Sequence, residues 1–430
     1  MTLIKTSVLT GISTVIKLVS AFVINKVIAI YIGPSGLAIV GQLQSFTSII
    51  TTFSNGAISS GIVKYTAEYQ TMEQKQKIFS SSIVISLICS LIISIFLFGF
   101  SDYLSELILK DIQYSSVFII FGATIFLFAL NMVLISILNG QKEIKKYVLV
   151  NIAGSIFSLV FTSILIMQLN LMGALYAMVL NQSVMFFVTL AFVIKSSWFK
   201  LEYFKQGLDK ESLSKLSKYS LMAIVSALTV PVSHLIIREY IGKNLGWDSA
   251  GYWQGIWYIS TMYLMLVTTT LGVYYLPRLS EIQDNKELRK EIFSGYKIIM
   301  PIVILASLII FLLKEYVILI AFSKDFMPMM ELFAWQLIGD VIKIASWLLA
   351  YLMLAKAMTK VFIYTEVLFS ALFVGLSILF VDKFGLVGIT YAYALNYLLY
   401  LFMMIFIFRK RFAKTFSNSS KLNRLKKQLI

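Results

Sequence analysis

Charged residues and cysteine are scarce in this sequence, and no polar segment is long enough to form a soluble domain. Only 13% of the 430 residues are charged, and Cys89 is the single cysteine. One cysteine excludes an intramolecular disulfide framework and redox chemistry, so we expect Cys89 to be structural. The sequence also contains no metal-ligand cluster, nucleophile triad or P-loop. These absences argue against an enzyme and against ATP-driven transport, and we expect no cofactor.

Hydrophobic residues, in contrast, dominate the chain from end to end. They make up 59% of it, and the mean hydropathy is +0.85, far above the values of globular proteins. Apolar runs of about 20 residues recur, each long enough to cross a bilayer as a helix, whereas β-barrel strands would give a weaker signal. We therefore predict an all-α integral membrane protein with twelve spans. The predicted spans are 8–32, 37–62, 78–101, 115–139, 146–168, 171–196, 217–241, 249–275, 294–315, 330–356, 361–382 and 384–408.

Lys and Arg are distributed unevenly among the segments that connect these spans. Most of the 37 fall in segments on one side of the membrane if the N-terminus is inside, whereas Asp and Glu show no such bias. This asymmetry is the positive-inside rule, so we expect both termini to be cytoplasmic and the first span to be a retained helix. The formal charge of +16 therefore reflects topology and not nucleic-acid binding. The basic tail, residues 409–430, is expected to contact anionic headgroups of membrane lipids.

The second half of the chain repeats the first. LMGALYAMVLN at 171–181 returns as LVGITYAYALN at 386–396, an offset of 215 residues, which is half the length. The same offset aligns Lys145 with Lys360 and Gly36 with Gly251. We predict two six-helix bundles related by an axis along the membrane normal, an arrangement of transporters with a central site. The predicted organisation is bundle 1–196, linker 197–216, bundle 217–408 and tail 409–430. The linker has amphipathic spacing and is expected to form a helix on the cytoplasmic surface.

Charged residues inside the predicted spans are the first candidates for function. Charge in hydrocarbon is costly, so such residues normally face a polar cavity, unless they snorkel or pair internally. Lys17 and Lys26 lie half a turn apart on the first span, and Lys26 is near enough to the outer end to snorkel. Both are candidates for substrate binding.

A polar and aromatic stripe runs along the span 330–356. It consists of Asp340, Lys343, Trp347 and Tyr351, which recur at helical spacing. Asp340 and Lys343 form a neutralising pair on the simpler interpretation. Alternatively, Lys343 binds a phosphate, the rings pack on sugars, and Asp340 takes part in ion coupling.

Glu366 is the second candidate for ion coupling. It aligns with Asn151 in the repeat, so only the second half has a carboxyl at this position. A lone buried carboxyl is suited to exchange protons during transport.

Lys64 and Arg278 occupy nearly equivalent positions in the two halves, at the expected cytoplasmic ends of their spans. They are candidates for a basic entrance that binds an anionic headgroup, or else ordinary positive-inside anchors. His234 is the only histidine, and it follows Pro231 in TVPVSHLIIREY. A structural hydrogen bond is the expected role of His234, with proton relay as the alternative, and Pro231 is expected to kink its helix.

Several stretches resemble the Wzx flippases of the MOP exporter superfamily, which also contains the MATE drug exporters and the lipid II flippases. They are GPSGLAIVGQ, GIVKYTAEY, GYWQGIW, YLPRLSE and LFAWQLIGDVIKIASWLLAYLMLAKA. The resemblance extends over the whole chain, and it is closest to the member that moves the lipid-linked enterobacterial common antigen unit, with O-antigen units as the alternative. Lys17 and Lys26 match the cations that the family places on its first helix. The span 249–275 lacks the mid-membrane cation of that pattern, and Arg278 is the nearest substitute.

The resemblance implies a secondary transporter in the bacterial inner membrane. Its substrate would be an undecaprenyl-pyrophosphate-linked oligosaccharide, moved from the cytoplasmic to the periplasmic leaflet by alternating access with ion coupling. A Wzy-type polymerase and a Wzz-type chain-length regulator would act next. Two alternatives remain: a cation-coupled MATE-like multidrug exporter, and a membrane glycosyl polymerase or ligase. Acidic residues in the first half would favour the exporter, and a large outer loop would favour the enzyme.

Overall fold

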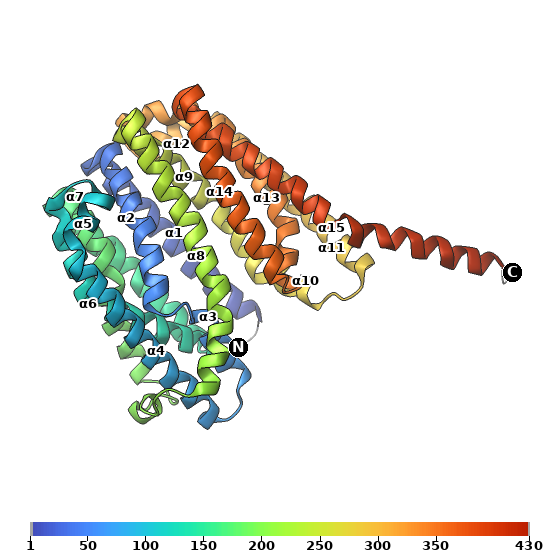
Figure 1. Ribbon diagram of the computed structural model, residues 1–430, viewed down its shortest axis with the longest axis horizontal. Helices are drawn as coiled ribbons and strands as arrows, with labels where there is room; N and C mark the ends of the chain where they lie inside the picture. The colour runs from blue at the N-terminus through green and yellow to red at the C-terminus, as the bar shows by residue number, and fades with distance from the viewer. Residues whose placement is uncertain (1–2, 429–430) are drawn as a thin grey trace. The chain divides into compact units, whose positions relative to one another are not determined.

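The computed structural model describes residues 3–428, and every regular element within them is a helix (Figure 1). The α-helices are α1 (Leu3–Tyr31), α2 (Gly33–Ser54), α3 (Ser59–Glu68), α4 (Met72–Gly99), α5 (Ser101–Leu104), α6 (Ser115–Gly140), α7 (Ile144–Ile194), α8 (Lys210–Leu245), α9 (Trp247–Thr270), α10 (Leu276–Glu281), α11 (Asn285–Leu312), α12 (Lys314–Ala321), α13 (Phe333–Ala355), α14 (Thr359–Phe384) and α15 (Gly388–Gln428). Short π- or 3₁₀-helices are Ser105–Leu109, Ile112–Tyr114, Leu201–Phe204, Leu271–Tyr275, Lys324–Leu332 and Gly385–Val387.

Eight segments of the described chain are long and apolar enough to cross a membrane. They are Leu9–Tyr31, Met72–Gly99, Ile112–Gly140, Ile144–Ile194, Ala223–Leu245, Asn285–Leu312, Lys324–Ala355 and Thr359–Arg409. The prediction of an all-helical, multi-pass membrane protein is thereby confirmed, but the count of twelve is not.

Two features account for the difference between eight and twelve. The segments Ile144–Ile194 and Thr359–Arg409 each contain two predicted spans, because each folds back at a turn. The other two predicted spans coincide with interrupted helices. One is α2, which is followed by a break and α3, and the other is α9, which continues through a π-helix into α10. Their many Gly, Ser, Thr, Gln and aromatic residues lower the hydropathy that identifies a span.

The backbone repeats itself at the offset seen in the sequence. Asn170 turns the chain within α7 with φ 50° and ψ −127°, and 215 positions later Gly385 separates α14 from α15 with φ 65° and ψ −151°. Lys142 and Ala357, at the same offset, both have positive φ, at 58° and 49°. These are uncommon conformations for residues other than glycine. Their recurrence shows that the sequence repeat is also a structural one.

Contacts divide the chain into two compact units. The first is Met1–Arg238 with Ala321–Ser323, and the second is Glu239–Ile320 with Lys324–Ile430. In the first unit α7 packs on α1 and α6, and α6 also packs on α4. In the second, α15 packs on α13 and α14, and α11 packs on α13 (Figure 1). The division falls inside α8, because the first part of this helix packs with the first unit.

The segment between the halves differs from its predicted form. Instead of one amphipathic surface helix, it contains the short helix Leu201–Phe204 and then the start of α8. Trp198 and Leu216, expected on that surface helix, belong to the core of the first unit, with 8% and 0% exposure. The Ser80 hydroxyl also donates to the Gly207 carbonyl at 2.9 Å. The segment thus packs into the first unit, because its aromatic side chains find partners on α4.

Trp198 fastens this segment to the first unit. Its ring lies 5.8 Å from that of Phe79, and its Nε1 donates to Glu143 Oε1 at 2.6 Å. We expect Trp198→Ala to lower the free energy of unfolding by roughly 3–5 kcal/mol, since it removes both contacts and leaves a cavity. Thermal unfolding of the purified protein in detergent measures this. Leu201→Ala, at a side chain that is 67% exposed, is the control and should change little. Equal melting temperatures for the two variants would contradict the packing described.

Candidate functional site

Asp340 is the centre of a polar cluster in the second unit. It lies on α13, is fully buried, and accepts three hydrogen bonds. Ser260 Oγ donates to its carboxylate at 2.6 Å, the Tyr263 hydroxyl at 3.0 Å and the Tyr393 hydroxyl at 2.8 Å. Helices α9 and α15 supply these donors. Three hydroxyls thus compensate part of the cost of burying the carboxylate.

Lys343, one turn further along α13, is surrounded by aromatic rings. Its ammonium lies 5.2 Å from the ring centre of Trp257, 4.9 Å from Trp347, 5.9 Å from Tyr393 and 5.5 Å from Tyr397. Such distances are typical of cation–π interactions. Tyr393 connects the two charged residues, because its hydroxyl contacts Asp340 and its ring faces Lys343.

The structure groups most of the residues predicted on this stripe. Asp340, Lys343 and Trp347 lie in one cluster, whereas Tyr351 packs in the core with its ring 6.4 Å from that of Tyr275. Glu366 on α14 is half-buried and interacts electrostatically with Tyr397 and Tyr400. The second unit therefore places a cation and two carboxyl groups among aromatic side chains.

Lys17 borders a cavity of about 250 Å³ in the first unit. The cavity lies among α1, α6 and both arms of α7, and its polar lining contains carboxamides, hydroxyls and Lys17. The lining residues are Lys17, Ser20, Ala21, Ile24, Asn131, Ile135, Val150, Asn151, Gly154, Ser155, Ser158, Asn181, Gln182, Met185 and Thr189. The Lys17 side chain is exposed and forms no ion pair with the described residues. The arrangement suits a ligand that carries negative charge and hydroxyl groups.

Lys26 does not line this cavity. Its ammonium donates to the carbonyl of Phe322, and the neighbouring Asn25 amide donates to the carbonyl of Ala321 at 3.2 Å. These carbonyls are at the C-terminal end of α12, where a cation is favourable. The two lysines of α1 are therefore in different surroundings, as expected from residues half a turn apart.

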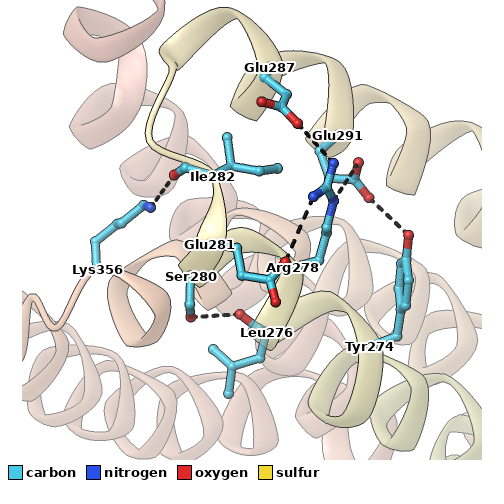
Figure 2. A network of polar contacts seen from close by, with 9 residues as sticks. All are labelled: Tyr274, Leu276, Arg278, Ser280, Glu281, Ile282, Glu287, Glu291 and Lys356. Atoms are coloured by element: carbon cyan, nitrogen blue, oxygen red, sulfur yellow. Dashed lines mark hydrogen bonds and ion pairs between the residues drawn. The ribbon is translucent and has the colours of Figure 1, made fainter. Parts of the chain in front are cut away.

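Lys64 and Arg278 both lie beside acidic groups. Lys64 is exposed, with its ammonium 3.9 Å from Glu68 and 5.2 Å from the ring centre of Tyr65. Arg278 contacts three carboxylates, at 2.8 Å for Glu287 and 3.8 Å for both Glu281 and Glu291 (Figure 2).

The network around Arg278 fixes α10 against α11 in the second unit (Figure 2). The Lys356 ammonium adds a bond to the carbonyl of Ile282 at 2.6 Å. Because three acidic groups face one guanidinium, this surrounding favours a structural tie over an open anion site.

Arg238, which is 1% exposed, was not among the predicted functional residues. Its Nη1 donates to Gln42 Oε1 at 2.9 Å and lies 3.5 Å from Ser45 Oγ. The available signal was its position within the predicted span 217–241, one turn after the buried His234. The carboxamides of the cavity were also missed, although Asn181 ends the repeated stretch and Gln182 directly follows it. No group of three or more His, Cys, Asp or Glu side chains in the described chain is placed to hold a metal.

The chain is similar to several known proteins. It is 27% identical over 402 residues to the lipid III flippases of Escherichia coli (strain K12) and Shigella flexneri, covering 93% of this chain and 96% of each relative. An inward-facing MATE multidrug transporter of the MOP superfamily matches with a TM-score of 0.78 at 17% identity, covering 93% of this chain and 95% of that one. The lipid II flippase MurJ in an inward closed conformation matches with a TM-score of 0.70 at 18% identity, over 96% and 89%.

The structural matches show the fold of the MOP superfamily, and at such identities they show the fold alone. The sequence match to a family is more specific. Residues 3–283, well over half of the chain, match the family described as polysaccharide biosynthesis protein. By its sequence, and in agreement with its fold, this chain is a member of the polysaccharide biosynthesis protein family.

Proposed function

We propose that this chain is a flippase for a lipid-linked oligosaccharide. One observation supports it above all: the similarity to the lipid III flippases covers both chains almost end to end. The proposed substrate is an undecaprenyl-pyrophosphate-linked oligosaccharide, moved from the cytoplasmic to the periplasmic leaflet of the bacterial inner membrane. Both termini are proposed to be cytoplasmic. No catalysis is involved, and a Wzy-type polymerase and a Wzz-type regulator are proposed to act on the product.

The charges of the two units suit this substrate. A pyrophosphate and its sugars cannot cross hydrocarbon unaided, so a flippase must offer them a polar, cationic surface while the prenyl chain stays in lipid. Lys17 beside the carboxamide cavity and Lys343 beside Trp347 supply cations next to groups that bind hydroxyls or sugar faces. We propose that Lys17, Lys343 and Trp347 bind the substrate. For Lys26, Lys64, Arg278 and Tyr351 the contacts described above favour structural roles.

Asp340 and Glu366 are proposed to couple transport to an ion. Asp340 balances the charge of Lys343, which is three residues away on the same helix. Protonation of Asp340 would remove this balance and convert one accepting oxygen into a donor, so the hydroxyls that donate to that oxygen would have to rearrange. Lys343 would then attract an anionic substrate more strongly. Glu366 is proposed to exchange protons through its interaction with Tyr397.

The MATE-like alternative has the fold likeness in its favour. The lining of the first-unit cavity disfavours a drug exporter, because a cationic drug would need a carboxylate and the lining has a lysine instead.

The flippase proposal is tested by expressing the chain in an E. coli strain that lacks its own lipid III flippase. We expect restored surface glycan, with no change in resistance to cationic dyes. Dye resistance without restored glycan would identify a drug exporter and contradict the flippase.

A further inference from the structure

The first half of α11, in the second unit, has a row of cations on one face. An open hollow of about 530 Å³ lies along this face, and its lining consists of Lys286, Arg289, Lys290, Phe293, Ser294 and Lys297. Spacings of three and four residues place these side chains on one side of the helix, and all six are exposed. In the part of the chain that the structure describes, the ammonium groups of the three lysines form no hydrogen bond or ion pair. The hollow is therefore strongly positive.

The carboxylates of the same segment have a different neighbour. Glu287 and Glu291 contact the guanidinium of Arg278 on α10, at 2.8 Å and 3.8 Å (Figure 2). Consecutive residues of a helix point about 100° apart, so Glu291 is turned away from Lys290. Because Arg278 already pairs with both carboxylates, an occupant of the hollow that balances the lysines must itself be anionic.

The cationic face becomes apolar further along the helix. Ile304 and Leu308 lie seven and eleven residues after Lys297, which returns them to the same side of α11, and each is 51% exposed. Phe293 adds an exposed ring within the hollow itself. A ligand with an anionic head and a hydrocarbon chain would contact both parts of this face. A free phosphate or an acidic peptide would use the first part only.

The first unit covers the corresponding face with protein. α4 and α11 both contain 28 residues, so Ser80 of α4 corresponds to Phe293 of α11 when the helices are aligned at their first residues. The Ser80 hydroxyl donates to the Gly207 carbonyl at 2.9 Å, and the Asp209 N–H donates to Ser81 Oγ at 3.0 Å. The segment that follows α7 thus packs on this face of α4, whereas the face of α11 is exposed and cationic.

The basic tail is a poor candidate to cover α11 in the same way. Residues 409–430 contain eight Lys and Arg residues and no Asp or Glu. Like charges repel, so the sequence disfavours contact between this tail and the lysines of α11. An anionic lipid of the surrounding membrane has the charge that the tail lacks, and its acyl chain matches the apolar part of the face.

We propose that this face of α11 binds an anionic phospholipid. Its phosphate lies in the hollow among Lys286, Lys290 and Lys297, and an acyl chain follows Ile304 and Leu308. The lipid comes from the leaflet in which α11 begins, which is the cytoplasmic one under the topology proposed above. Because this lipid is a component of the membrane and not the transported substrate, the inference does not depend on the flippase assignment.

The test is native mass spectrometry of the full-length protein, released from detergent micelles with defined lipids. We expect phosphatidylglycerol to bind at least twentyfold more tightly than phosphatidylethanolamine, whose ammonium cancels the phosphate charge. Lys290→Gln combined with Lys297→Gln should remove most of this preference, because each cation beside an anionic lipid contributes about fivefold. Glycerol 3-phosphate should bind at least tenfold more weakly than phosphatidylglycerol, since it has no acyl chain.

Lys360→Gln combined with Lys383→Gln is the matched control. Both lysines are exposed on α14, so this variant removes the same charge from the same unit outside the hollow, and it should keep the full preference. Melting temperatures confirm that both double variants fold. Undecaprenyl phosphate should displace phosphatidylglycerol no better than phosphatidylglycerol itself does.

Four results would each overturn the proposal. Equal binding of the two phospholipids would leave an acidic protein as the better occupant, and equal binding of glycerol 3-phosphate would indicate a site for free anions. Displacement by tenfold less undecaprenyl phosphate would assign the face to a prenyl-linked substrate. An unchanged preference in the folded Lys290→Gln and Lys297→Gln double variant would place the lipid elsewhere on the protein.

Discussion

Asp340→Ala is expected to abolish transport and to lower the free energy of unfolding by roughly 3–5 kcal/mol. The substitution leaves the ammonium of Lys343 without its balancing charge, and it removes the acceptor of Ser260, Tyr263 and Tyr393. Both losses occur in a region of low dielectric, where unpaired polar groups are costly. Transport is measured by the restoration of surface glycan in the strain that lacks its own flippase. Stability is measured by thermal unfolding in detergent.

Two further variants separate a structural role of Asp340 from a functional one. Asp340→Ala combined with Lys343→Met removes the whole charged pair, so it should recover the part of the stability that was lost through the unbalanced ammonium. If the pair serves only the fold, this double variant should also transport. We expect no transport, because the ion-coupling group and a substrate cation are both absent. Asp340→Asn keeps an accepting oxygen and should fold, but it should not transport. A stable Asp340→Asn variant with full rescue would contradict the coupling role.

The part of the fold that could be predicted was the position of the spans, because each helix that crosses a membrane needs a long apolar run. Apolar length located the spans, and the turn between 168 and 171 was correctly placed next to Asn170. The interruption after α2, where Gly56 and Ala57 have positive φ, was not predicted. Apolar length locates a span but carries no signal for a local break in the backbone. The segment around Trp198 was misjudged for a related reason: its amphipathic spacing indicates a buried face, but not whether lipid or protein covers that face.

The candidate site was predictable where chemistry and helical spacing coincided. Asp340, Lys343 and Trp347 were found together because they share one face of one helix, which is a local property. The rings of Trp257, Tyr393 and Tyr397 around Lys343 were not foreseen, since they come from other helices. The contacts of Lys26 with Phe322 and of Arg278 with Glu287 likewise join residues whose proximity no local pattern reveals. The sequence thus indicates which groups need a partner, whereas the packing of distant helices determines which partners they contact.

Gly388→Ala is expected to reduce the amount of folded protein severely. Gly388 begins α15 at the turn after α14, where a Cβ would lie 2.0 Å from the carbonyl oxygen of Phe380 and 2.4 Å from its carbon. Both are backbone atoms, so no rotamer change relieves the clash and the turn itself must open. We expect a cost of about 3 kcal/mol or more, seen as loss of the monodisperse protein and a lower melting temperature.

The repeat provides a second site for the same test. Gly173, 215 positions earlier, has the same surroundings: its Cβ would lie 1.9 Å from the carbonyl oxygen of Leu165 and 2.4 Å from its carbon. Gly173→Ala should therefore be as harmful as Gly388→Ala. Gly375→Ala is the control, since no atom lies within 4 Å of its added Cβ, and inside α14 it should stabilise by about 0.5–1 kcal/mol. Similar behaviour of all three variants would contradict the two close turns. A severe effect at Gly388 alone would show that both halves contain this turn, but that only the turn at Gly388 is essential for stability.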